Sequence, residues 1–184
     1  MLRRTLLLAA LAAPAASLVP ARASARPPGT SAGPELLSAV SAMRGVMEGT
    51  GGNVHILYAP WCSVTPRLHA DTRGFLGRMR LNWIPFAGGQ PEGRTATELL
   101  LRSGRPEDVP RYFTSIRALA PLAEAPLADA QERSLSSLLT YYYRDVGGSL
   151  ATPTVVFGMR DGTVRVMKGA PGPAHLADVA AYAA

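Results

Sequence analysis

The residue with the clearest capacity for chemistry is Cys62, the single cysteine of a 184-residue chain. Its thiolate form would be a nucleophile, and a thiolate is stabilised where a helix begins because free backbone N–H groups and the helix dipole favour negative charge. One cysteine excludes an intramolecular disulfide framework and a cysteine-rich zinc site. The three histidines (His55, His69 and His175) are scattered singly, so we expect no metal site.

The segments on either side of Cys62 place it at the end of a strand. Residues 53–59 (NVHILYA) are apolar on both faces and predict a central strand, and residues 67–79 predict a helix. Sites in open α/β sheets collect at the carboxyl ends of strands. Thr65 has two open interpretations: its hydroxyl donates to the Cys62 thiolate, or it is the N-cap of a helix that starts at Pro66.

The remaining segments predict an α/β domain with a block of helices between its two sets of strands. A helix is expected over 34–48. A strand is expected over 80–86, and it would pair in parallel with the strand over 53–59 through a crossover. A hairpin is expected from strands 153–159 and 163–168 around Asp161-Gly162. Further helices are expected over about 95–103, 107–119, 129–146 and 174–184.

Residues 1–25 predict a secretory signal peptide. Arg3 and Arg4 precede an apolar stretch, and Ala-x-Ala sites end at Ala23 and Ala25. This stretch is shorter than the roughly 20 residues that a membrane-spanning helix needs, although an uncleaved anchor is the alternative. We therefore expect a flexible lead-in over 26–33, a domain over 34–184, periplasmic location and no membrane association after cleavage.

The composition is that of an ordinary globular domain, with 47% hydrophobic and 17% charged residues. Removing residues 1–25, with their three arginines, would lower the formal charge from +6 to +3. The chain has no run of basic residues and no alternation of arginine with aromatic residues. Nucleic acid is therefore not expected as a partner.

Two motifs together resemble the thioredoxin fold: YAPWC (58–62), which follows the predicted strand, and ATPTVVF (151–157), which opens the hairpin. The helical insertion, about 92–148, is similar to that of the Dsb-type exported thiol–disulfide oxidoreductases, particularly the catalytic domain of the DsbC/DsbG isomerase group. The resemblance covers about residues 53–184. It implies a thioredoxin-like α/β fold with a central mixed sheet of about four strands, flanking helices and a helical insertion before the hairpin.

The resemblance also implies roles for particular residues. Cys62 would be the nucleophile, Pro153 would follow a cis peptide bond opposite it, and Thr152 would touch and tune the thiol. Trp61, Pro153 and Thr154 would contact an extended substrate. No cofactor is implied.

The main departure from the family is the resolving cysteine, because C-x-x-C reads here as Cys62-Ser63-Val64-Thr65. A single thiol cannot store a disulfide within the chain, but it can form a mixed disulfide that another thiol releases. We therefore predict monothiol exchange on extended or unfolded exported proteins, with a low-molecular-weight thiol or a redox partner. The alternative is a binding or chaperone module that has lost redox cycling. Residues 26–52 are too short for the dimerisation domain of DsbC/DsbG proteins, so we expect a monomer.

Overall fold

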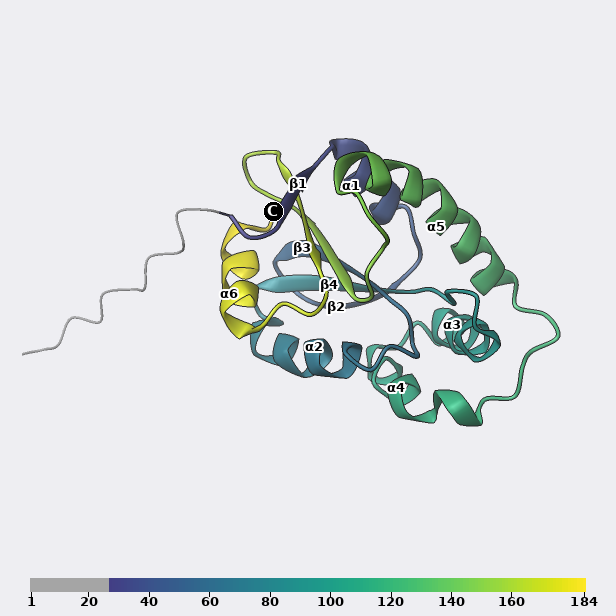
Figure 1. The fold of residues 1–184 in the computed structure, drawn as a ribbon. Coiled ribbons are helices and arrows are strands. Elements are labelled where there is room, and N and C mark those ends of the chain that lie inside the picture. The colour runs from purple at the N-terminus through teal and green to yellow at the C-terminus, as the bar shows by residue number, and fades with distance from the viewer. Residues whose placement is uncertain (1–26) are drawn as a thin grey trace, which may run out of the picture.

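A computed structural model describes residues 27–184 as a six-stranded mixed sheet with helices on both faces (Figure 1). The strands are β1 (Thr30–Ala32), β2 (Val46–Gly49), β3 (Gly52–Tyr58), β4 (Met79–Pro85), β5 (Thr154–Gly158) and β6 (Val164–Lys168). They follow the order β1-β6-β5-β3-β4-β2 across the sheet. The predicted signal peptide, residues 1–25, lies outside the described residues.

Strand β3 lies inside the sheet, with β4 parallel on one side and β5 antiparallel on the other. Its alternating side chains enter two different cores: Val54 and Ile56 pack into one, and Leu57 into the other. A strand that is apolar on both faces is stable only where helices cover both faces. This explains why the NVHILYA segment forms a central strand.

The helices form two layers, one on each face of the sheet. The α-helices are α1 (Pro34–Ser41), α2 (Thr65–Thr72), α3 (Pro91–Ser103), α4 (Arg111–Ser115), α5 (Pro126–Asp145) and α6 (Pro173–Tyr182). Helices α1 and α5 cover one face, and α2, α4 and α6 cover the other (Figure 1). Helix α3 packs against α5 and also supplies Ala96 and Leu100 to the core beneath α4. Within residues 27–184, no helix combines the length and the apolar composition that crossing a membrane requires.

The two edge strands correct the sequence-based prediction of about four strands. Residues 30–32, expected in a flexible lead-in, form β1 and pair with β6. The helix expected over 34–48 ends at Ser41, and residues 46–49 form β2 against β4. A Cβ on Gly45 would lie 2.0 Å from Asn82 Oδ1, so this glycine lets the chain approach β4 closely.

Two further predicted helices are shorter or broken at identifiable residues, whereas α3 and α5 begin earlier than expected, at Pro91 and Pro126. Helix α2 ends at Thr72 and is followed by a 3-10 turn (Arg73–Phe75), instead of continuing to residue 79. The segment expected as one helix over 107–119 contains Pro110, which lacks an N–H donor. A 3-10 turn (Pro106–Asp108) therefore precedes α4, and a second 3-10 turn (Ile116–Ala118) follows it.

Candidate active site around Cys62

Cys62 lies in the loop after β3, against the segment that leads into β5. Its backbone N–H donates to the Ala59 carbonyl at 3.0 Å, and its Sγ donates to the Thr152 carbonyl at 3.1 Å. The residue is 9% exposed. Because β3 and β5 are antiparallel neighbours, the end of β3 meets the start of β5. Sheet pairing therefore joins two motifs that are far apart in the sequence.

The loop before β5 is fixed by hydrogen bonds on both sides. The Thr152–Pro153 peptide bond is cis, as expected for this proline. Thr152 Oγ1 accepts from the Ala59 N–H at 2.8 Å, and the Pro153 carbonyl accepts from the Gly169 N–H at 2.8 Å. Thr152 thus contacts both the thiol and the loop that carries it. The tuning and substrate-pairing roles of Thr152 and Pro153 stay predictions.

Thr154, expected to contact substrate, lies apart from the surface of the site. Its side chain is fully buried, and its Oγ1 donates to the Ala151 carbonyl at 2.6 Å. The hydroxyl therefore holds the start of β5 in place and does not face an incoming chain.

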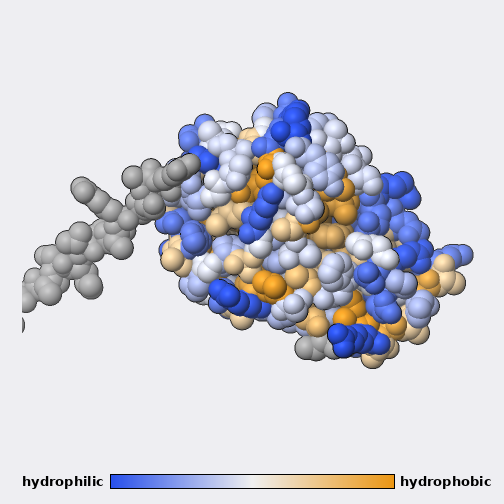
Figure 2. Space-filling model, viewed as in Figure 1, coloured by the Kyte–Doolittle hydropathy of each residue, from blue (hydrophilic) through white to orange (hydrophobic). Residues whose placement is uncertain are grey.

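Trp61 is the exposed aromatic neighbour of the thiol. Its side chain is 42% exposed, yet Nε1 donates to the Ala87 carbonyl at 2.9 Å. A Cβ on Gly93 would lie 3.0 Å from the indole and 2.6 Å from that carbonyl, so the glycine lets the ring pack on the start of α3. Trp61 lines a depression of about 420 Å³ together with Gln90, Glu92, Ile116 and Arg117. On the face shown in Figure 2, apolar residues gather between α5 and α2, with hydrophilic residues around them.

Thr65 is not the N-cap of the helix, and its donation to the Cys62 thiolate stays a prediction. It is the first residue of α2 and Val64 is the N-cap, so the prediction of Thr65 as N-cap is wrong. The Thr65 side chain is fully buried, and its Oγ1 has no hydrogen-bond partner within residues 27–184. Since Cys62 lies three residues before the first helical position, the sulfur receives little of the dipole effect, which falls off within a turn.

Two further buried polar groups on this side of the sheet were not found from the sequence. The hydroxyl of Tyr58 and Nε2 of His69 have no hydrogen-bond partner among the described residues. Both rings pack on Trp83, at centroid distances of 5.7 Å and 5.3 Å respectively. Burial raises the pKa of Tyr58, and burial with the nearby Arg73 guanidinium lowers the pKa of His69. Both groups are therefore uncharged near neutral pH. For His69, the only signal in the sequence was its four-residue spacing from Thr65, which places both residues on one helix face.

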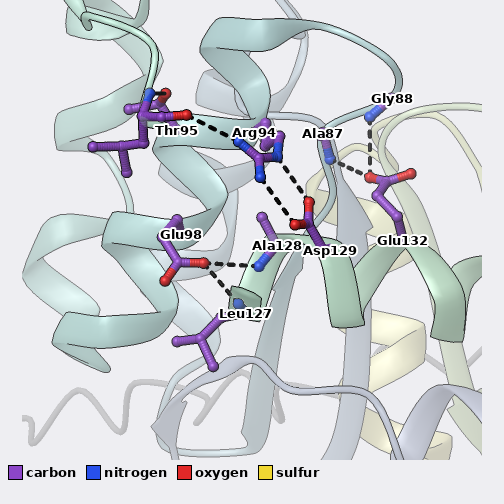
Figure 3. Close-up of polar contacts among 10 residues, drawn as sticks. Ala87, Gly88, Arg94, Thr95, Glu98, Leu127, Ala128, Asp129 and Glu132 are labelled. Carbon is purple, nitrogen blue, oxygen red and sulfur yellow. Dashed lines mark hydrogen bonds and ion pairs between the residues drawn. The ribbon is translucent and has the colours of Figure 1, made fainter. Parts of the chain in front are cut away.

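The helical insertion holds the loop on which Trp61 rests. Glu132 of α5 accepts from the N–H groups of Ala87 and Gly88, at 2.6 Å and 3.3 Å (Figure 3). Arg94 of α3 forms a two-point ion pair with Asp129 of α5, at 2.7 Å and 2.9 Å. These contacts tie α3, α5 and the loop after β4 together beside the cysteine.

The fold is that of known thioredoxin-like proteins. A periplasmic thioredoxin-like protein from Salmonella enterica serovar Typhimurium aligns over 81% of this chain and 95% of its own, with a TM-score of 0.54 and 11% identity. ScsC from Proteus mirabilis, in a compact conformation, aligns over 79% of this chain and 75% of its own, with a TM-score of 0.52 and 14% identity. No protein-family model and no curated protein matches the sequence. At these identities the likeness concerns the fold, and it confirms the predicted fold class.

Proposed function

We propose that this protein is an exported thiol–disulfide exchange factor that works with Cys62 alone. The observation that carries the proposal is the contact between Cys62 Sγ and the Thr152 carbonyl, beside a cis proline and at the carboxyl end of β3. The thioredoxin-like fold supports it. A periplasmic location is part of the proposal, supported by the signal-like residues 1–25 and by the description of the Salmonella protein as periplasmic.

The reaction is an exchange of sulfur partners. The Cys62 thiolate attacks one sulfur of a substrate disulfide, the new S–S bond forms, and the second substrate sulfur leaves as a thiolate. A substrate thiol then attacks the mixed disulfide and frees Cys62, so the substrate is isomerised without net oxidation. With a low-molecular-weight thiol such as glutathione, two such thiols are oxidised to a disulfide while the substrate disulfide is reduced.

The resting position of the sulfur defines what must change during attack. An S–H group that donates to a carbonyl is in its neutral form, and a thiolate cannot make that bond. Ionisation therefore releases Sγ from the Thr152 carbonyl. Trp61 and the Pro153 edge then offer an extended, unfolded exported chain a surface beside the sulfur, and a monomer suffices for this.

The test is the rate of mixed-disulfide formation with glutathione disulfide, followed by intact mass. The proposal requires one adduct per chain at Cys62, formed at least about ten times faster than on a peptide of residues 58–66, since an exchange factor must hold a thiol that is more reactive than a free one. Cys62→Ala should form none, and the exposed neighbour variant Ser63→Ala should react like the parent protein.

One result would contradict the proposal, and another would favour its alternative. A rate on the folded protein no greater than on the peptide would contradict exchange at Cys62. If Cys62→Ala also bound an unfolded reduced protein as tightly as the parent chain, the binding or chaperone alternative would be favoured.

A further inference from the structure

A second set of polar side chains lies on the face of the sheet that α1 covers, on β3 and β4 and outside the site around Cys62. Ser41 Oγ, at the end of α1, lies 3.2 Å from His55 Nε2 on β3. The other ring nitrogen, Nδ1, lies 3.4 Å from the side-chain amide of Asn82 on β4. His55 and Asn82 are register partners in the parallel β3–β4 pair. Three separate segments thus build a continuous Ser–His–Asn chain of contacts.

Burial increases along this chain of contacts from Ser41 to Asn82. Ser41 is exposed, whereas His55 and Asn82 are 7% and 6% exposed. Burial lowers the pKa of His55, so its imidazole is neutral near pH 7 and one ring nitrogen can accept a proton. A hydroxyl in contact with a neutral, buried imidazole is the arrangement in which a serine becomes a nucleophile.

The amide of Asn82 can set the tautomer of this imidazole. As placed, its Nδ2 faces His55, and its buried Oδ1 has no hydrogen-bond partner among residues 27–184. The two ends of an amide are exchanged by a 180° rotation. After that rotation Oδ1 accepts from His55 Nδ1–H, and the lone pair of Nε2 is then directed to the Ser41 hydroxyl.

Open space for a small ligand lies next to the serine. A depression of about 480 Å³ is lined by Leu37, Ser41, Asn53, His55, Gly158 and Ala184. Both the hydroxyl and the imidazole therefore belong to a surface that a small molecule can reach.

We propose that Ser41 is a second nucleophile of this protein, with His55 as its general base and Asn82 as a positioning residue, and that the depression accepts a small carboxylic ester. The Ser41 oxygen bonds to the ester carbonyl carbon while its proton passes to His55 Nε2. The bond to the leaving alcohol breaks, and the alcohol takes that proton. Water then attacks the acyl-serine, with His55 accepting and returning a proton, so the products are a carboxylic acid and the free serine.

The test is the rate of labelling by a fluorophosphonate, with the modified serine located by peptide mass spectrometry. Ser38, exposed on the same helix, is the internal reference. We expect Ser41 to react at least about 100-fold faster than Ser38, and His55→Gln to lower its rate to the Ser38 level, since a general base contributes 100-fold or more. Acetylation of Ser41 by p-nitrophenyl acetate should follow the same pattern.

Equal labelling of Ser41 and Ser38 would overturn the proposal, and so would a Ser41 rate that His55→Gln leaves unchanged. If His55→Gln fails to fold, Asn82→Asp decides, because a carboxylate always accepts from Nδ1–H and should raise the Ser41 rate. A merely structural Asn82 would give no such increase. Cys62 takes no part in this reaction, so its outcome is separate from the test of thiol exchange.

Discussion

At the scale of single residues, Thr152 connects the two halves of the candidate active site with two oxygen atoms. Its carbonyl accepts from the Cys62 thiol, and its Oγ1 accepts from the Ala59 N–H. Ala59 is fully buried, so its N–H has no access to water as a substitute partner. The hydroxyl of Thr152 is thus needed to keep the end of β3 beside the cis proline.

Thr152→Val should lower the free energy of unfolding by about 1–3 kcal/mol, because it keeps the shape but leaves the Ala59 N–H unpaired in the interior. Thr152→Ser, which keeps the hydroxyl, is the matched control. Urea denaturation of the three proteins measures the difference. Equal stability of the valine and serine variants would mean that this hydrogen bond does not hold the loop.

At the scale of elements, the long helix α5 depends on a side chain from α3 for its N-terminal cap. Its N-cap residue, Ala125, offers no side-chain acceptor. Glu98 of α3, fully buried, accepts instead from the N–H groups of Leu127 and Ala128 at 2.8 Å and 2.9 Å (Figure 3). Although burial opposes ionisation, the Ala128 N–H and the Arg102 guanidinium hold the pKa of Glu98 below its ordinary value.

Glu98→Ala should therefore destabilise the insertion by about 3 kcal/mol, since one buried and one partly buried N–H group lose a charged acceptor. Hydrogen exchange at Leu127 and Ala128 should become faster than in the parent protein. The control is Glu124→Ala, at an exposed loop position, which should change stability by less than about 0.5 kcal/mol. Unchanged exchange at the two amides in Glu98→Ala would show that α5 is capped in another way.

At the scale of the whole molecule, each face of the sheet carries one histidine whose pKa is lowered, buried in the case of His55 and partly buried in that of His69. Burial lowers the pKa of His55 beneath α1 and, together with Arg73, that of His69 beside Trp83. Below the ordinary value of about 6.5, the unfolded chain binds protons that the folded chain does not. The folded state is therefore favoured at higher pH and loses stability as the pH falls through this range.

The free energy of unfolding should decrease from about pH 7 to about pH 5, by up to about 1.4 kcal/mol per pH unit for each histidine. The double variant His55→Gln, His69→Gln should flatten this slope. His175→Gln, at an exposed position, should leave it as it is. Urea titrations at several pH values measure the slope, and a flat profile for the parent protein would contradict the prediction.

The sequence alone predicted the fold class, the central strand, the hairpin and the meeting of Cys62 with the Thr152-Pro153 segment. The first three features depend on signals within short segments: apolar residues on both faces of 53–59, the Asp161-Gly162 turn and the alternation in 163–168. The resemblance of YAPWC and ATPTVVF to thioredoxin-like proteins then indicated which segments come together.

Only the tertiary structure decided the edge strands, the burial of Thr65 and the Ser41–His55–Asn82 contacts. The spacing of Val46 and Met47 fits a helix as well as a strand, and pairing with β4, more than 30 residues later, selects the strand. Thr65 likewise suits an N-cap locally, but the helix begins one residue earlier than that role requires. Such outcomes depend on contacts between distant segments, whose energies outweigh the weak local preferences of a single residue.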